Sequence, residues 1–535
     1  MPDEKNIVFS KYTVALIENL KQIKSKSKPD EISKIAVSQT VSFFGIVYEK
    51  IRNAIEYRED HLIRRAAIER ILRRRFSLNP DGKGEGENLL RELLWARYFP
   101  NESLGGQDIL VTQSIIDKYI ALKKLIITGR DLETQKFLAQ FILDLLTCEI
   151  EESLSPEAAQ RESSFTFFIY QILKAKIKIE DLPETQKDTF FLTAIEKAYR
   201  RSDIPFQRYH LFITFYKTIA DNTVEDLKKL SIKLPAIFSK VDEIIKNPLS
   251  DKLLRFTKKQ LPPFLILFHI INSKFEELDK ILSQKDLLWN EVDLMCRTKY
   301  QAVSARMRVL AVRSFIYIFL TKMIFAIILE YPVSLYLYNE VNKISIIINS
   351  VFPPILMLLI VSFFRLPGED NTKRIYNRLI DIIDKDKSFE TQVAIITKKP
   401  RPKRPILIFG FTIFYSFTFF ITLLIIYQIL TMLTFNLISQ VIFIFFVSVV
   451  TFFSYRIKQI VNEYRLQEKE GILSPIFDFF FMPVLSLGKF FSSGLSKLNF
   501  FIVIFDFIIE APFKFLFEIV EEWISFVRKR KEEII

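Results

Sequence analysis

The feature that most constrains this chain is a set of four long apolar segments between residues 309 and 455. A helix needs about 20 apolar residues to cross a hydrocarbon core of about 30 Å. Backbone groups inside such a core find no water to bond, so a spanning segment has to satisfy them as a helix. The sequence therefore predicts four membrane-spanning helices, at residues 309–329, 344–364, 406–434 and 438–455.

The distribution of Lys and Arg between these segments predicts their orientation. Eleven Lys and Arg residues lie in the connection 365–405, whereas the connection 330–343 contains only Lys343 and the turn at Asn436 contains none. Basic connections stay on the cytoplasmic side of a membrane. We therefore expect an inner-membrane, multi-pass protein whose N-terminus, basic loop 365–405 and C-terminal region are cytoplasmic. Because no apolar core follows Met1-Pro-Asp-Glu-Lys, no secretory signal peptide is expected.

Residues 1–300 have helical spacing of apolar residues, and the whole chain holds only 12 glycines. No internal repeat was found, so an irregular, cytosolic all-α domain is predicted. Thr223 and Asp226 have the spacing of a helix start. The helix beginning near residue 251 is expected to break at Pro262-Pro263. The predicted helices are 6–25, 30–76, 86–98, 108–127, 131–152, 156–177, 183–200, 206–220, 223–247 and 251–272.

The transmembrane region, 301–455, is predicted to follow the soluble domain without a linker. Neither Gly nor Pro interrupts the chain from Ser273 to Val309, so one helix should continue from the soluble part into the first span. The second span contains Pro353-Pro354, which lack backbone donors and are expected to kink or break it.

The C-terminal region, 456–535, is rich in Phe and carries a narrow polar stripe at helical spacing. It predicts amphipathic helices on the cytoplasmic side that lie in the membrane interface, although residues 476–517 could instead cross the membrane. Two basic groups are candidates for contact with anionic lipid headgroups. They are Lys398, Lys399, Arg401, Lys403 and Arg404, and then Arg528, Lys529, Arg530 and Lys531.

Lys322 is the most informative single residue, because it lies inside the first predicted span. A charge at that depth is costly unless it is paired or reaches water. One interpretation is an intramembrane polar site in which Lys322 pairs with Glu330 or another acidic residue and lines a path for an ion or anionic solute. Asn349 and the Pro353-Pro354 pair could belong to the same site, as in the broken helices of transporters. The other is that Lys322 snorkels to an interface and Asn349 only joins helices. A membrane-anchored scaffold predicts that Lys322→Leu leaves activity and folding intact, whereas a conduction path predicts that it abolishes solute flux.

The net charge of +13 fits a membrane surface better than nucleic acid, because the basic residues crowd beside apolar spans. The densest basic cluster of the soluble part is expected to form a solvated, salt-bridged face, with Glu56, Glu59, Asp60 and Glu69 as local partners. Its members are Arg58, Arg64, Arg65, Arg70, Arg73, Arg74 and Arg75.

No enzyme motif is present, and the chain has only three His and two Cys residues, without metal-ligand spacing. We therefore expect no catalytic, metal or cofactor site. The fold expected is all-α: an integral membrane protein with a cytosolic helical domain, four spans and interfacial helices. The function expected is a membrane-anchored scaffold or regulator with an unidentified cytosolic protein partner. The first alternative function is a transporter or channel with a polar site around the first two spans. The second alternative is a membrane-bound enzyme without a recognisable motif. The protein could also form a homo-oligomer.

Overall fold

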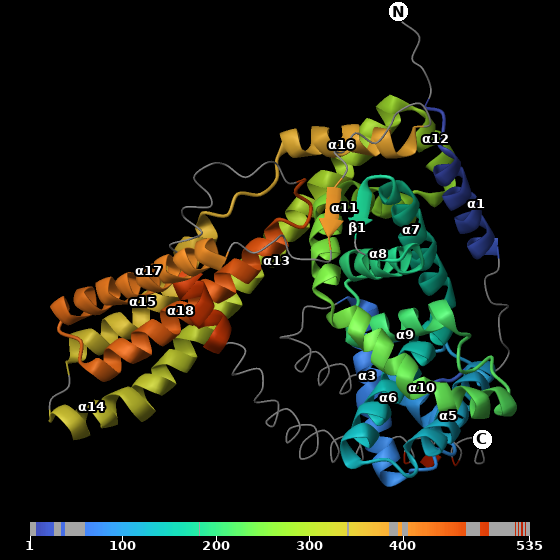
Figure 1. The fold of residues 1–535 in the computed structure, drawn as a ribbon, viewed down its shortest axis with the longest axis horizontal. Coiled ribbons are helices and arrows are strands. Elements are labelled where there is room, and N and C mark those ends of the chain that lie inside the picture. The colour runs from blue at the N-terminus through green and yellow to red at the C-terminus, as the bar shows by residue number, and fades with distance from the viewer. Residues whose placement is uncertain are drawn as a thin grey trace, which may run out of the picture. The chain divides into compact units, whose positions relative to one another are not determined.

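The computed structural model describes residues 7–25, 34–37, 59–180, 182–339, 342–384, 394–397, 405–466 and 482–491, and also Ile519, Trp523, Phe526, Val527 and Arg530 (Figure 1). This part of the chain is almost entirely helical, as the sequence predicted. It forms two compact units. The N-terminal unit comprises residues 9–261, 389–398 and 503–535, and the apolar unit comprises residues 1–8, 262–388 and 399–502.

Most helices of the N-terminal unit begin and end within about five residues of the predicted bounds. The predicted helix 30–76 is wrong in its first part, because residues 34–37 are not helical and Lys34 forms an antiparallel bridge with Gly105, while the described helix begins at Asp60. Thr223 caps one of the helices, because its hydroxyl accepts a hydrogen bond from the Asp226 N–H while the Asp226 carboxylate accepts one from the Thr223 N–H. In chain order the helices are α1 (Lys11–Ser25), α3 (Asp60–Leu78), α4 (Glu85–Trp95), α5 (Gly106–Ile127), α6 (Leu132–Leu154), α7 (Pro156–Lys174), α8 (Glu184–Tyr199), α9 (Ile204–Phe215), α10 (Val224–Lys246) and α11 (Pro248–Ser273).

The predicted break at Pro262-Pro263 is wrong, because α11 continues through both residues to Ser273. Prolines inside a helix remove hydrogen bonds and crowd the preceding turn. The flanking Leu261 and Phe264 are buried, and both prolines are buried with them. Packing of this face therefore holds the helix together despite the lost hydrogen bonds.

Helix α6 is the centre of the N-terminal unit and packs against α3, α5 and α9. Its side chains Leu138, Phe141 and Leu145 have no exposed surface. The Phe141 ring stacks on Phe238 of α10, with a centroid distance of 3.8 Å. Burial of such large apolar side chains, at about 25 cal/mol per Å² removed from water, is the main force that assembles these helices.

One short parallel strand pair was not predicted. Strand β1 (Ile177–Glu180) pairs with β2 (Ala394–Thr397), with Ile177 opposite Ala394 and Glu180 opposite Thr397. The Lys252 ammonium also donates a hydrogen bond to the Thr397 carbonyl, at 2.9 Å. The basic connection between the second and third predicted spans therefore contributes a strand to the N-terminal unit.

The apolar unit holds four helices that are long and apolar enough to cross a membrane. They overlap the four predicted segments and run from Lys285 to Tyr338, Lys343 to Ser362, Pro405 to Met432 and Leu437 to Val461. The first is composed of α13 (Lys285–Phe325), the π-helix η3 (Ala326–Glu330) and α14 (Tyr331–Tyr338). The other three are α15 (Lys343–Ser362), α17 (Pro405–Met432) and α18 (Leu437–Val461).

Helices α13, α15 and α18 pack against one another, and Figure 1 shows them side by side. Their shared core includes Ile318, Met357, Phe446 and Val450. Helix α17 instead leaves most of its large apolar side chains exposed, from Ile406 to Met432. Such a surface suits lipid or another apolar surface rather than water.

Helix α13 confirms that one helix continues into the first apolar segment, because its 41 residues run without interruption. Its buried residues recur at helical spacing from Leu288 to Lys322. The predicted start near Ser273 is wrong, since two short helical turns, η2 (Phe275–Glu277) and α12 (Leu278–Ser283), come first. The extended backbone of Gln284 separates them from α13.

A break in α15 at Pro353-Pro354 is also not observed, because the helix is continuous from Lys343 to Ser362. The two prolines lie on its buried face together with Asn349 and Met357. Packing of this face against α13 and α18 keeps the segment helical, although Pro353 and Pro354 donate no helical hydrogen bonds.

The basic connection 365–405 also contains a helix, α16 (Glu369–Ile383), whose apolar face includes Ile375, Leu379 and Ile383. Asn371 joins α16 by hydrogen bonds to α13 and to the segment that follows α18. Its amide nitrogen donates to the Tyr300 hydroxyl at 2.7 Å and to the Tyr464 carbonyl at 2.8 Å, and its oxygen accepts from the Leu466 N–H at 2.9 Å.

Of the C-terminal region 456–535, predicted to form interfacial helices, the structure describes residues 456–466, which include the end of α18, then helix Met482–Phe491 and five single residues. Gly488 lies so close to α18 that a Cβ there would approach the Ser448 carbonyl oxygen to 2.2 Å. The Phe491 ring meets Phe445 of α18 edge to face at 4.8 Å. This short apolar helix therefore packs on α18, and the close approach explains the glycine.

Candidate functional site

The structure brings three of the predicted polar residues together inside the apolar unit. The Lys322 ammonium lies 2.9 Å from Oε2 of Glu330. The Asn349 amide nitrogen donates to Oε1 of the same carboxylate at 2.6 Å. All three side chains are fully buried. The amine of Lys322 is therefore enclosed by protein and paired with Glu330 in this structure.

The π-helix η3 explains how two residues eight positions apart on one element meet. In an α-helix, eight residues turn the chain by about 800°, which leaves the second side chain about 80° away from the first. A π-helix turns less per residue, so η3 rotates Glu330 back toward the face of Lys322.

Pro332 gives a local reason for η3. It has no N–H to donate to the carbonyl of Ile328, and its ring crowds that carbonyl in a regular α-helix. The neighbouring Tyr331 N–H bonds to the Ala326 carbonyl, five residues back. The dipeptide Tyr331-Pro332 is the local sequence signal for η3, which was not among the predicted elements.

Two further helices complete the surroundings of the pair. From α15, Asn349 also donates to the Ser439 carbonyl of α18, at 3.1 Å. From α18, the Phe446 ring lies 5.0 Å from the Lys322 nitrogen, so the cation faces an aromatic ring. The pair is therefore enclosed by α13, η3, α15 and α18.

The predicted prolines lie on the same buried face of α15 as Asn349. Pro353 and Pro354 cannot donate the helical hydrogen bonds that would normally reach the carbonyls of Asn349 and Ser350. The Oδ1 atom of Asn349 and the Oε1 atom of Gln440 are buried without a hydrogen-bond partner in the described part of the chain. The site is thus neutral in charge but rich in oxygen acceptors.

Most of the predicted lipid-contact residues lie outside the described residues. These are Lys398, Lys399, Arg401, Lys403, Arg404, Arg528, Lys529 and Lys531. Arg530 is described; it is exposed, and its guanidinium lies 5.6 Å from the Phe526 ring.

The predicted salt-bridged basic cluster is formed only partly by local partners. Arg65 and Arg73 pair with Glu69 on the same helix, at 2.8 and 2.7 Å, as predicted. Arg64, however, reaches Glu151 of α6 at 2.5 Å. Arg74 and Arg75 both reach Glu92 of α4, at 2.5 and 2.6 Å, while Arg58 and Glu56 lie outside the described residues. The cluster therefore joins helices instead of forming a solvated face.

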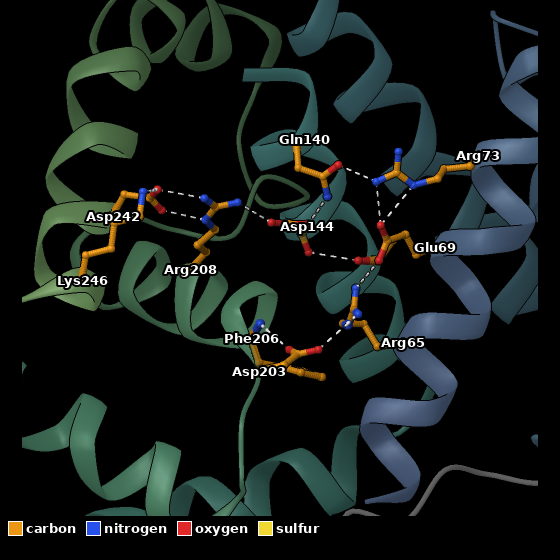
Figure 2. A network of polar contacts seen from close by, with 11 residues as sticks. Arg65, Glu69, Arg73, Gln140, Asp144, Asp203, Phe206, Arg208, Asp242 and Lys246 are labelled. Atoms are coloured by element: carbon orange, nitrogen blue, oxygen red, sulfur yellow. Dashed lines mark hydrogen bonds and ion pairs between the residues drawn. The ribbon is translucent and has the colours of Figure 1, made fainter. Parts of the chain in front are cut away.

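Figure 2 shows how this network extends across the N-terminal unit. The Arg208 guanidinium of α9 donates a hydrogen bond to the Asp144 carboxylate of α6, at 2.6 Å. It also donates to both carboxylate oxygens of Asp242 of α10, at 2.8 and 2.9 Å. Burial alone would raise the pKa of Asp242, but its hydrogen bonds from Arg208 and Lys246 lower it. Three helices are thereby joined through one guanidinium.

A second buried cluster surrounds His210 of α9. Its ring nitrogens contact the carboxylates of Glu152, at 2.7 Å, and Glu196. Burial alone would lower the pKa of His210, but these two carboxylates outweigh it and raise the pKa to about 9. The His61 ring packs on Phe206 beside it, with centroids 5.2 Å apart. Burial, followed by nearby Arg200 and Arg64, lowers the pKa of His61 to about 3.

The structure offers no group of ligands for a metal ion among the residues it describes. Both cysteines are buried, and burial raises the pKa of the Cys148 thiol well above its ordinary value. A thiol held in its neutral form is a poor nucleophile. Comparison with known protein families, characterised proteins and solved structures found no match to this chain.

We predict that breaking the Lys322–Glu330 pair is costly but replacing the whole pair is not. Either Lys322→Met or Glu330→Met alone leaves a buried charge and should lower the free energy of unfolding by about 3–5 kcal/mol. The double variant leaves neither charge and should recover most of that loss. The free energy of unfolding in mixed micelles is measured for the native protein, the two single variants and the double variant. Lys343→Met, at an exposed position, is the control. Neutral single variants would contradict the buried pair.

The raised pKa of His210 predicts a pH-dependent contribution to stability. That contribution is complete below the ordinary pKa of 6.5 and is lost as pH rises through about 9. The difference in unfolding free energy between the native protein and His210→Gln should therefore shrink by roughly 3 kcal/mol between these pH values. Thermal unfolding followed by circular dichroism measures it.

His269→Gln is the matched control for this experiment. Burial, followed by nearby Lys299, lowers the pKa of His269 to about 4, so its ring is neutral in the folded protein from pH 6.5 to 9. In the unfolded protein it loses its remaining charge just above pH 6.5, so its effect on stability should change by less than about 0.5 kcal/mol over this range. A His210→Gln effect that is equally constant would contradict the charged cluster.

The titratable and charged groups that face His210, and on which this pH dependence rests, are Glu152, Glu162, Glu196, Arg200 and His61.

Proposed function

We propose that this is a multi-pass membrane protein whose four apolar helices anchor a helical unit that engages a cytosolic protein partner, as a scaffold or regulator. The observation that carries the proposal is the closed Lys322–Glu330–Asn349 cluster, whose side chains have no exposed surface. A conduction path needs its charged groups to reach water, whereas an anchor needs them neutralised. The enclosed, paired charge favours the anchor.

The proposed topology places the N-terminal unit, the connection 365–405 and the C-terminal region in the cytoplasm, with the protein in the inner membrane. The excess of Lys and Arg in that connection supports it. The pairing of β1 with β2 supports it independently, because two paired strands lie on the same side of a membrane. In this topology, the basic residues of 398–404 and 528–531 are placed to meet anionic headgroups.

The topology predicts which positions a membrane-impermeant maleimide reaches in intact cells. In a background with Cys148 and Cys296 replaced by Ala, Glu340→Cys should be labelled from outside. Lys385→Cys should be labelled only after the membrane is permeabilised, because residue 385 lies in the proposed cytoplasmic connection. Labelling of Lys385→Cys in intact cells would overturn the orientation.

A transporter is the second candidate, and one observation favours it. Two buried oxygens, Oδ1 of Asn349 and Oε1 of Gln440, have no hydrogen-bond partner in the described part of the chain. Leaving such a group unpaired costs about 1–3 kcal/mol, which a bound water or cation could offset. Glu330 and the π-helix lie next to Asn349, and π-helical turns are frequent at functional sites.

Proton movement separates the two candidates, because Lys322 and Glu330 are both proton-carrying groups. The protein is reconstituted into vesicles loaded with the pH-sensitive dye pyranine, and a pH difference is imposed. An anchor predicts no proton flux above that of protein-free vesicles, for the native protein and for Lys322→Met/Glu330→Met alike. Flux in the native protein that the double variant abolishes would overturn the scaffold and support transport.

A further inference from the structure

The N-terminal unit has a groove between α3, α5 and α6, with a volume of about 740 Å³. Its floor is apolar and includes Phe76, Ile120, Ile127 and Leu143. Its rim opens to solvent, because Lys123 on that rim is exposed. We call this feature the α3–α5–α6 groove.

The charged residues that line the groove all have the same sign. They are Arg73, Lys123, Lys124 and Lys136, and no Asp or Glu lines it. Lys124 pairs with Asp81 at 2.7 Å, but both side chains are about two-thirds exposed, at 65% and 64%, so this pair contributes little and can exchange.

Lys123 and Lys136 have no ion-pair partner among the described residues. Both are exposed and lie above the apolar floor, one on α5 and one on α6. A ligand that suits this groove therefore has an apolar face for the floor and negative charge for the rim.

The spacing of the apolar lining residues indicates the shape of that ligand. On α5, Ile120 and Ile127 are seven residues apart, and on α6, Ala139, Leu143 and Leu146 follow at four and three. Each stripe covers about two helical turns, or roughly 10 Å. A groove between helical stripes of this length accepts an amphipathic helix whose anchors recur at i, i+4 and i+7.

We propose that the α3–α5–α6 groove binds an acidic amphipathic helix of a partner protein. This deepens the proposed function and rests on it, because it defines the class of partner that the anchored unit engages. The apolar face of the helix lies on Ile120, Ile127 and Leu143. Its flanking carboxylates meet Lys123 and Lys136.

The probe is a fluorescent peptide of about 16 residues, long enough to form a helix, with Leu at i, i+3, i+4 and i+7 and Glu elsewhere. Its anisotropy is measured with the full-length chain in nanodiscs. The acidic peptide should bind, and the same peptide with Lys in place of Glu should bind at least about tenfold more weakly.

Two variants test the rim and the floor separately. Lys123→Glu/Lys136→Glu reverses exposed charges and should weaken binding of the acidic peptide about tenfold or more while the circular dichroism spectrum is unchanged. Leu143→Asp places a charge on the floor and should weaken it similarly. Lys233→Glu/Lys240→Glu is the matched control, since these exposed lysines of α10 do not line the groove, and it should change affinity less than about twofold.

Several results would overturn the proposal. One is an acidic peptide that does not bind, or binding that neither the rim nor the floor variant weakens. Another is decanoate that binds with a dependence on Lys123 and Lys136 while the acidic peptide does not bind, which would assign the groove to an anionic lipid. A concentration-dependent dimer that the rim variant abolishes would assign it to a second copy. The proton-flux experiment tests the proposed membrane anchor separately from the groove. A peptide that does not bind would therefore overturn the groove proposal without changing the result of the proton-flux experiment.

Discussion

The apolar unit depends on one requirement: a charge that lies among apolar helices has to find its opposite within the protein. Lys322 meets it through Glu330 at 2.9 Å, and Asn349 ties the same carboxylate to a neighbouring helix. This contact needs η3, because a regular α-helix would turn Glu330 away from Lys322. It also needs α15 and α18 at close range. Helix packing and charge neutralisation therefore depend on the same local irregularity.

A buried ion pair of this kind affects the free energy of unfolding in two different ways. Its desolvation is expensive, so it adds little net stability compared with a well-packed apolar pair. Removing one partner is costly because the remaining ion has no water. The pair therefore specifies an arrangement of α13, η3 and α15 more than it stabilises one. The same logic applies in the N-terminal unit, where Arg208 joins three helices through buried carboxylates.

The connection between the second and third apolar segments has more structure than its composition indicated. Its basic residues predicted a loop, yet it contains α16, fastened by Asn371, and the strand β2. Residues 365–405 thus contribute to both units, and their strand pairing agrees with the orientation that Lys and Arg counts favour. An anchored unit with an acidic-helix groove would give such a protein a way to recruit a partner to a membrane surface.

The all-α class and the four apolar segments could be predicted from the amino-acid order, because apolar runs and helical spacing are local properties. The amino-acid order also indicated Lys322, Glu330 and Asn349 as candidates, since polar groups are conspicuous among apolar neighbours. It misjudged Pro262-Pro263 and Pro353-Pro354, because intrinsic helix-breaking tendency is outweighed when the flanking face is buried.

Contacts between residues far apart in the chain could not be predicted and are seen only in the folded protein. The partner of Arg64 lies 87 positions away at Glu151, and β1 pairs with a strand more than 200 residues later. No local pattern encodes such separations, because they result from the packing of whole helices. The pairing of Lys322 with Glu330 likewise depends on the rotation that η3 gives to Glu330.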